Sequence, residues 1–98
     1  MHFLKHEFDA EEGDVLEVDV QAEPRGANVV LLDNENFAGY VSNSPSFQYV
    51  GGFLDTDKPV RLRVPRAGHW FLVVDLGGRG GRMSAAVRLI KRATETVA

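Results

Sequence analysis

The chain has 98 residues, of which 44% are hydrophobic and 26% charged, and it contains no cysteine. This length suits one domain, and the absence of cysteine excludes disulfides and thiolate metal ligands. The net charge of −3 hides an uneven distribution, because residues 1–57 carry 12 acids and 2 bases whereas residues 58–98 carry 2 acids and 9 bases. Two separate domains of this size would be barely stable, so we expect one domain in which acidic and basic strands lie side by side.

Apolar runs in the chain are short. None approaches the roughly 20 residues that a membrane-spanning helix needs, and the start, MHFLKHEFDAEE, lacks the basic-then-apolar layout of a signal peptide. We therefore expect a cytoplasmic protein with no membrane contact. The domain is expected to span residues 1–90, with residues 91–98 as a polar C-terminal tail that frays.

Alternating apolar and polar residues predict antiparallel strands in the first half of the chain, because successive side chains of a strand point to opposite faces. Within residues 16–20 the apolar side chains fall on even positions and the acids on odd ones. Residues 29–32 are all apolar, which indicates a central strand covered on both faces. The strands predicted here span residues 2–8, 14–21, 28–32 and 47–50, and Gly51-Gly52 is expected to end the last one.

A short helical turn is predicted between the third and fourth of these strands. Asp33 or Asn34 can cap a turn over residues 34–40, and residues 42–46 read as a solvated loop. Four aromatic residues bracket this loop, either as a recognition surface for a sugar or a peptide or as a small cluster that packs the loop onto the fold. We favour the second interpretation for these residues, which are Phe37, Tyr40, Phe47 and Tyr49.

Three further strands are predicted in the second half, at residues 59–64, 69–76 and 83–90. Trp70 belongs to the inward face of the second of them, and the glycine-rich residues 77–81 form a hairpin tip. In the first of them Arg61 and Arg63 point outward. If that strand lies beside the acidic strand at 14–21, cross-strand ion pairs form on the solvent side. The expected partners of the two arginines are Glu17 and Asp19.

The number and spacing of these elements indicate the fold class. Seven to eight short strands at a spacing of roughly 8–12 residues, with one short helical turn near residues 34–40, predict an all-β fold. The expected architecture is an antiparallel β-sandwich or a jelly roll. The sequence is far less informative about activity than about fold.

Several runs along the chain resemble one known family. They are FLKHEF at 3–8, GDVLEVDV at 13–20, NVVLLDNENFAGY at 28–40, YVGG at 49–52, PVRLRVPRAGHWFLVVDLGG at 59–78 and SAAVRLI at 84–90. Together they resemble the small bacterial family catalogued as domain of unknown function 1883. The resemblance implies a compact β-sandwich that sometimes occurs beside signalling domains of the Toll/interleukin-receptor type. It implies no agreed reaction and no catalytic residues, so it adds no site.

The three histidines are the only basis for a metal-dependent enzyme. His2 and His6 lie four residues apart, and a two-histidine site would need a carboxylate, such as Glu7 or Asp75, from elsewhere in the fold. This spacing is not diagnostic. We expect His6 to pack against Phe8, and His69 to cap a strand edge or bond a backbone carbonyl. No serine, histidine and acid are tied together by spacing, so we predict no catalytic residue, no metal and no cofactor.

Six arginines of the second half are the best functional lead. If their strands adjoin, some form a basic face on which Phe71 also lies, and such a face can bind single-stranded nucleic acid. The negative net charge argues against nucleic acid. The residues 77–81 lack the following helix of a phosphate loop, but Arg79 at this tip is expected to be a mobile cation. The arginines are Arg61, Arg63, Arg66, Arg79, Arg82 and Arg88.

These observations favour a binding or interaction module over an enzyme. Its partner would be a protein or a small molecule, bound by the 34–52 region or by the 77–81 tip, because loops on a rigid frame usually carry recognition. A bare strand edge also allows a homo-oligomer. A metal-dependent enzyme and a weak nucleic-acid binder remain the alternatives. The candidate contact residues are Phe37, Tyr40, Tyr49, Arg61, Arg63, His69 and Arg79.

Overall fold

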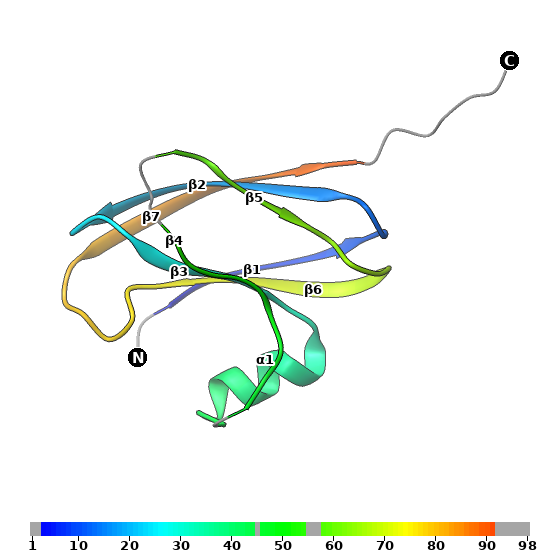
Figure 1. Cartoon of the computed structure of the whole chain (residues 1–98), viewed down its shortest axis with the longest axis horizontal. Helices are drawn as coiled ribbons and strands as arrows, with labels where there is room; N and C mark the ends of the chain where they lie inside the picture. Colours follow the sequence, from blue (N-terminus) through cyan, green and yellow to red (C-terminus); the bar gives the residue numbers. More distant parts are fainter. Residues whose placement is uncertain (1–2, 45, 55–57, 92–98) are drawn as a thin grey trace, which may run out of the picture.

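The computed structural model describes residues 3–44, 46–54 and 58–91, in which seven β-strands and one α-helix form. The strands make two antiparallel sheets that lie one above the other (Figure 1). Sheet A has the strand order β1-β6-β3-β4 and sheet B the order β5-β2-β7. The predicted all-β sandwich is thereby confirmed. The elements are β1 (Phe3–Ala10), β2 (Val15–Glu23), β3 (Ala27–Leu32), α1 (Asn34–Val41), β4 (Val50–Leu54), β5 (Val60–Arg63), β6 (Gly68–Asp75) and β7 (Arg82–Ile90).

The main hydrophobic core lies between the two sheets. Sheet B contributes the even positions of β2, as its alternating sequence predicts, and sheet A contributes Trp70, which is 3% exposed. Alternate residues face the core because successive side chains of a strand point to opposite faces. The buried members of this core are Ala10, Leu16, Val18, Val20, Ala27, Val29, Leu31, Leu62, Val64, Trp70, Leu72, Val74 and Leu76.

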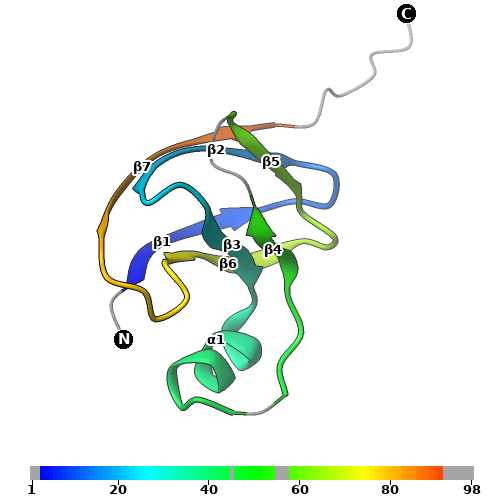
Figure 2. The same cartoon turned by 60° about the vertical axis from the view of Figure 1, so that its left-hand side comes forward.

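A second, smaller core lies on the outer face of sheet A, where α1 packs on the side away from sheet B (Figures 1 and 2). The ring of Phe37 stacks on Phe71 with 4.2 Å between centroids, and Tyr40 meets Phe3 edge-on at 5.4 Å. The aromatic residues of α1 therefore form the predicted packing cluster. The prediction that Phe71 lies on a basic face is wrong, because α1 covers it. The buried members are Val30, Leu32, Tyr40, Phe71 and Val73.

A buried carboxylate anchors α1 to sheet A. Asp75 is 3% exposed, and its Oδ2 accepts a hydrogen bond from the hydroxyl of Tyr40 at 2.5 Å. Its Oδ1 accepts from the side-chain amide of Asn28 and from the backbone N–H of Gly77, both at 2.7 Å. Burial and the hydrogen bond to Asp75 raise the pKa of Tyr40 far above its ordinary value. A buried charge of this kind is tolerated because its oxygens have donors.

Sheet B places the acidic strand β2 between the basic strands β5 and β7. Glu17 lies opposite both Arg61 and Arg88 in the register, and its two carboxylate oxygens accept hydrogen bonds from them at 3.0 and 2.9 Å. The predicted pairing of the oppositely charged strands is therefore confirmed for Glu17 and Arg61. The register does not oppose Arg63 to Asp19, so that predicted ion pair does not form.

The fourth strand differs from its prediction. We expected residues 47–50 to form it and Gly51-Gly52 to end it, whereas β4 begins at Val50 and runs through both glycines. Gly51 has a φ of +111°, and a Cβ there would lie 2.1 Å from the carbonyl oxygen of Val29. The glycine permits a close approach to β3 inside the strand. Phe47 instead turns back onto Tyr40, with 5.8 Å between the ring centroids.

The chain beyond β7 is described only to Lys91. Its Nζ lies 2.8 Å from the carboxylate of Asp14, which is 1% exposed. Of the predicted tail, residues 92–98 lie outside the described residues. Within the described part, no helix combines the length and the apolarity that crossing a membrane would require.

Candidate ligand site

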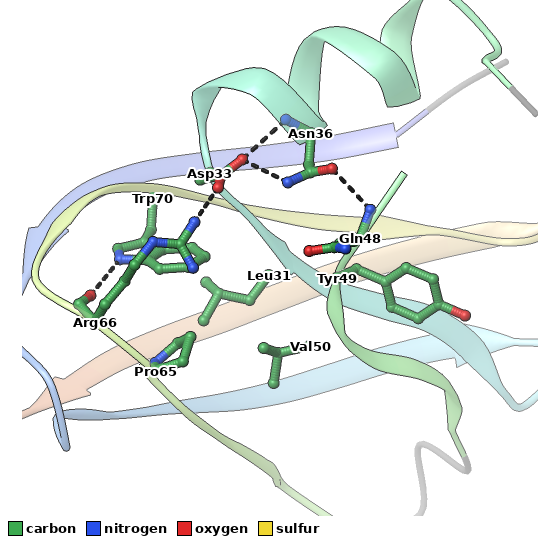
Figure 3. Close-up of a pocket in the computed structure, with 9 residues that line it drawn as sticks. All are labelled: Leu31, Asp33, Asn36, Gln48, Tyr49, Val50, Pro65, Arg66 and Trp70. Carbon is green, nitrogen blue, oxygen red and sulfur yellow. Dashed lines mark hydrogen bonds and ion pairs between the residues drawn. The ribbon is translucent and has the colours of Figure 1, made fainter. Parts of the chain in front are cut away.

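A pocket of about 180 Å³ opens beside Arg66, where β3 leads into α1 and the turn at residues 64–67 leads into β6 (Figure 3). Its walls come from segments that are distant in the sequence, because β3 lies between β6 and β4 in sheet A. We call it the Arg66 pocket. The residues that line it are Leu31, Asp33, Asn36, Gln48, Tyr49, Val50, Pro65, Arg66 and Trp70.

Apolar side chains of the main core form the floor of the Arg66 pocket. Leu31 and Trp70 belong to the main core and are 0% and 3% exposed. The indole Nε1 of Trp70 donates a hydrogen bond to the carbonyl oxygen of Arg66 at 3.0 Å. The turn at residues 64–67 is thereby fixed against the ring, and Pro65 and Val50 complete the apolar wall. Such a floor can hold a small apolar body without rearranging.

The polar rim is built around the start of α1. Asp33 caps the helix, with its Oδ1 accepting from the backbone N–H of Asn36 at 2.9 Å and from the Asn36 side-chain amide at 2.8 Å. The side-chain oxygen of Asn36 accepts in turn from the backbone N–H of Gln48 at 2.7 Å. This chain of bonds ties the segment before β4 to the helix (Figure 3). The helix cap therefore also shapes the pocket.

Arg66 supplies the positive charge of the pocket. Its guanidinium lies 4.9 Å from the centroid of the Trp70 ring and pairs with Oδ2 of Asp33 through one nitrogen. The other guanidinium N–H groups have no partner among the residues that the structure describes, and the side chain is 61% exposed. Partial burial acts to raise the pKa of Asp33, but the hydrogen bonds from Asn36 and the Arg66 charge outweigh it, so this pKa lies below its ordinary value.

A second hollow, of about 260 Å³, lies on the other side of the Asp33–Arg66 pair and reaches His69. The Nδ1 of His69 lies 2.8 Å from the carboxylate of Asp9, and its Nε2 lies 3.1 Å from that of Glu7. Both carboxylates come from β1, which pairs with β6. Their hydrogen bonds, that of Asp9 first, raise the pKa of His69 above its ordinary value. The prediction that His69 bonds a backbone carbonyl is therefore wrong.

The seven predicted contact residues do not come together in one place. Phe37 and Tyr40 pack beneath α1, and of the seven only Tyr49, which is 53% exposed, lines the Arg66 pocket. Arg61 and Arg63 lie together on the outer face of sheet B. His69 lies beside the pocket, in the second hollow. Arg79 lies in the tip that follows β6.

The prediction that Arg79 is a mobile cation is wrong. Its Nε donates to the carbonyl oxygen of Leu76 at 2.9 Å, and a terminal nitrogen donates to that of Gly26 at 2.6 Å. The guanidinium also lies 5.2 Å from the centroid of the Phe53 ring. Arg79 therefore fastens the glycine-rich tip to the rest of the fold.

The histidines do not assemble a metal site within the described part of the chain. His6 stacks on Phe8 with 5.9 Å between ring centroids, as predicted, and His2 lies outside the described residues. No group of three or more His, Cys, Asp or Glu side chains there is arranged to hold a metal ion.

Sequence reasoning named the main pocket residues but did not bring them together. It placed Arg66 in the basic cluster, Asp33 at the helix start and Trp70 in the core. The turn that precedes Trp70 is a local signal that Arg66 lies near the indole. Nothing local indicates that Asp33, 33 residues earlier, meets Arg66, because that contact depends on the order of strands in sheet A.

These features define a small antiparallel β-sandwich with one helix in its described part. The guanidinium of Arg66 lies at the rim of its pocket. The chain belongs to the family described as domain of unknown function 1883, which matches residues 1–93. The resemblance inferred from the sequence is thereby confirmed. No curated protein and no solved structure matched the chain.

Proposed function

We propose that this protein is a binding module and that the Arg66 pocket takes a small ligand with a carboxylate and a short apolar body. The observation that carries this proposal is the state of Arg66. One of its nitrogens is held by Asp33, and its other donors stand over an apolar floor without a partner in the described part of the chain. Arginine is suited to carboxylates because its planar donor array binds both oxygens at once.

The remaining polar groups of the rim also favour an anion. Asp33 has both carboxylate oxygens engaged, by Asn36 and by Arg66. The side-chain amide of Gln48 has no hydrogen bond to another described residue, and it lies across the pocket from Arg66 (Figure 3). Donors therefore outnumber free acceptors at the rim. The volume of about 180 Å³ suits a molecule about the size of benzene, which a cavity of roughly 150 Å³ can hold.

The protein's only tryptophan allows a direct test, because Trp70 lines the pocket and its fluorescence reports on the site. We expect isovalerate to change this fluorescence saturably, and its neutral analogue isovaleramide to have a much smaller effect. Arg66→Gln should abolish the response to isovalerate. Arg63→Gln, an exposed arginine on sheet B, is the matched control and should leave the response unchanged.

Three results would contradict this proposal. The first is a wild-type protein that gives no saturable change with isovalerate. The second is an equal response to isovalerate and isovaleramide, which would remove the role of charge. The third is an equal response in Arg66→Gln and Arg63→Gln, because the response would then come from elsewhere. Circular dichroism of Arg66→Gln checks that the variant is folded.

A sensory role rests on the double use of Asp33. The same carboxylate holds Arg66 and caps α1, so a ligand that draws Arg66 away changes the electrostatics of the helix start. Val41 at the end of α1 is 57% exposed and Tyr49 is 53% exposed, which leaves apolar surface on this layer for a partner. Hydrogen exchange of the α1 amides, measured with and without isovalerate, tests the coupling. Unchanged exchange at saturating isovalerate would contradict the sensory role.

A further inference from the structure

Edge strands of both sheets lie along two sides of the sandwich, and each side has a different pair of them. Figure 2 shows β4 and β5 together at one side, and β1 and β7 together at the other. Within the described part of the chain, β1 pairs only with β6, and β7 pairs only with β2. These two edge strands have 8 and 9 residues. Each therefore presents a long row of backbone groups that can pair with another strand.

A groove of about 210 Å³ separates the two edge strands. Its floor is the main core, and Leu4 at its rim is 37% exposed. The inward residues Leu16, Val18 and Val20 of β2 are at most 1% exposed, whereas all four inward residues of β7 are only half-buried. Apolar surface is thus left uncovered along this side. The residues that line the groove are Leu4, Lys5, His6, Leu72, Val74, Ala85 and Val87.

Neither edge strand is interrupted by proline or carries an inward-pointing acid, lysine or arginine. Natural edge strands are often interrupted by proline or a bulge, or carry a charge that points inward. β7 contains no proline or glycine, and its inward positions from Met83 to Leu89 are all apolar. The only polar residue at an inward position of β1 is His6, which is stacked on Phe8. Both strands are regular enough to be extended by a partner.

We propose that this side pairs with the same side of a second copy of the chain. The groove brings His6, at the middle of β1, opposite Ala85 and Val87, which flank Ala86 at the middle of β7. One twofold axis normal to the sheets can therefore pass through both midpoints. It places β1 antiparallel to its copy and β7 antiparallel to its copy, so both sheets continue across one isologous interface.

The charges on both strands are compatible with this symmetry. In an antiparallel pair centred on His6, Lys5 lies opposite Glu7 of the second copy, and the pair occurs twice. In the pair centred on Ala86, Arg88 lies opposite Ser84 of the second copy, so no arginine faces an arginine directly. The exposed Leu4 lies opposite Phe8 of the second copy, which covers the rim of the groove.

The association state of the full chain tests this proposal. Sedimentation equilibrium over a dilution series should show a dimer that dissociates at low concentration. Ala86→Lys puts two lysines face to face on the axis, and we expect it to weaken the dimer about fivefold, the effect of roughly 1 kcal/mol. Ala86 is exposed, so the fold of one copy should be unaffected. Mixing Ala86→Lys with Ala86→Glu should restore association as a heterodimer.

The matched control is Gln21→Lys, which adds the same charge to the same exposed face of sheet B but lies on the central strand β2. It should leave the dimer unchanged. A monomer at every concentration would overturn the proposal. A dimer that Ala86→Lys does not weaken, or that Gln21→Lys weakens equally, would place the interface elsewhere. None of these results depends on the Arg66 pocket.

Discussion

The outer faces of the two sheets have different environments. The outer face of sheet A carries a second core under α1, and Leu32 and Val73 on it are both 0% exposed. The outer face of sheet B has no covering element among the described residues, and its charged side chains pair with one another around Glu17. The central strands β3 and β6 of sheet A therefore bury both faces, whereas the central strand β2 of sheet B buries one.

This difference determines how much a substitution should lower the free energy of unfolding. On sheet B, a residue and its neighbour in sequence lie in different environments, one in the core and one in solvent. On the central strands β3 and β6 of sheet A, neighbours lie in two different cores. The Arg66 pocket correspondingly lies away from the middle of sheet A, beside the start of α1.

The largest expected effects come from neighbouring leucines of β3. Leu31 faces the main core and Leu32 faces the core under α1, and both are 0% exposed. Leu31→Ala and Leu32→Ala should each lower the free energy of unfolding by about 3 kcal/mol, from lost burial and the cavity left behind. On β2, Val18→Ala should cost about 2 kcal/mol and Asp19→Ala less than about 0.5 kcal/mol. Urea unfolding measures all four.

The comparison of the two sheets fails if Leu32→Ala behaves like Asp19→Ala. That result would mean that α1 covers sheet A without contributing to its stability. Hydrogen exchange of the α1 amides in Leu32→Ala separates this case from loss of the whole fold.

The same asymmetry explains how much of the fold could be predicted. β2, β5 and β7 place apolar residues at alternate, inward positions because the other face of sheet B is uncovered in the described part of the chain, and the inward residues predicted for them pack in the main core. β3 is a continuous apolar run, and its burial on both faces was also predicted. The sequence signal failed at β4, because a glycine pair usually ends a strand, whereas Gly51 lies inside one to let the backbone approach Val29. That approach is a tertiary contact with no local signature.

The candidate site was less predictable than the fold. The candidate contact residues were predicted from residue type alone. Residue type does not show which hydrogen-bond donors already have a partner in the fold. Arg79 and Arg66 are both arginines in turns, but Arg79 donates to the carbonyl oxygens of Leu76 and Gly26. Arg66 keeps most of its donors over a pocket. The distinction depends on contacts between residues that are distant in the sequence.

A smaller effect is expected from the hydroxyl that links α1 to sheet A. Tyr40→Phe removes the donor to Oδ2 of Asp75 and leaves a buried carboxylate oxygen without that bond. We expect a loss of about 1–3 kcal/mol, because an unmet hydrogen bond to a buried group costs its desolvation. Tyr49→Phe is the control, because Tyr49 is exposed and should give no change. Equal stability of both variants in urea would show that Asp75 does not anchor the helix.

A pH-dependent effect on stability is expected from His69 on β6. The carboxylates of Asp9 and Glu7 raise the pKa of His69 in the folded protein, so protonation of His69 stabilises the fold. This contribution is fully present below the unfolded pKa of about 6.5 and is lost as the pH rises through the higher folded value. Thermal midpoints of wild type and His69→Gln should therefore differ most below about pH 6 and converge as the pH rises through the folded pKa of His69.

The control for this pH dependence is Gln21→Ala, at an exposed position on sheet B that carries no titratable group. Its difference from wild type should not follow the same pH course. A His69→Gln difference that grows with rising pH would reverse the assigned sign. A difference that stays constant would show that His69 contributes by packing on Phe71, with which its ring makes an edge contact at 5.2 Å.

The smallest effect is expected on the bare face of sheet B. Arg61 and Arg88 hold the pKa of Glu17 below its ordinary value, but both arginine side chains are 68% exposed. Glu17→Gln should shift the thermal midpoint less than Tyr40→Phe or His69→Gln does, because solvent screens these pairs. The shift should vanish in 1 M salt. It should also vanish on acidification, because a lowered folded pKa stabilises only while the carboxylate is charged. A salt-insensitive loss as large as that of Leu32→Ala would mean that the two outer faces do not differ energetically.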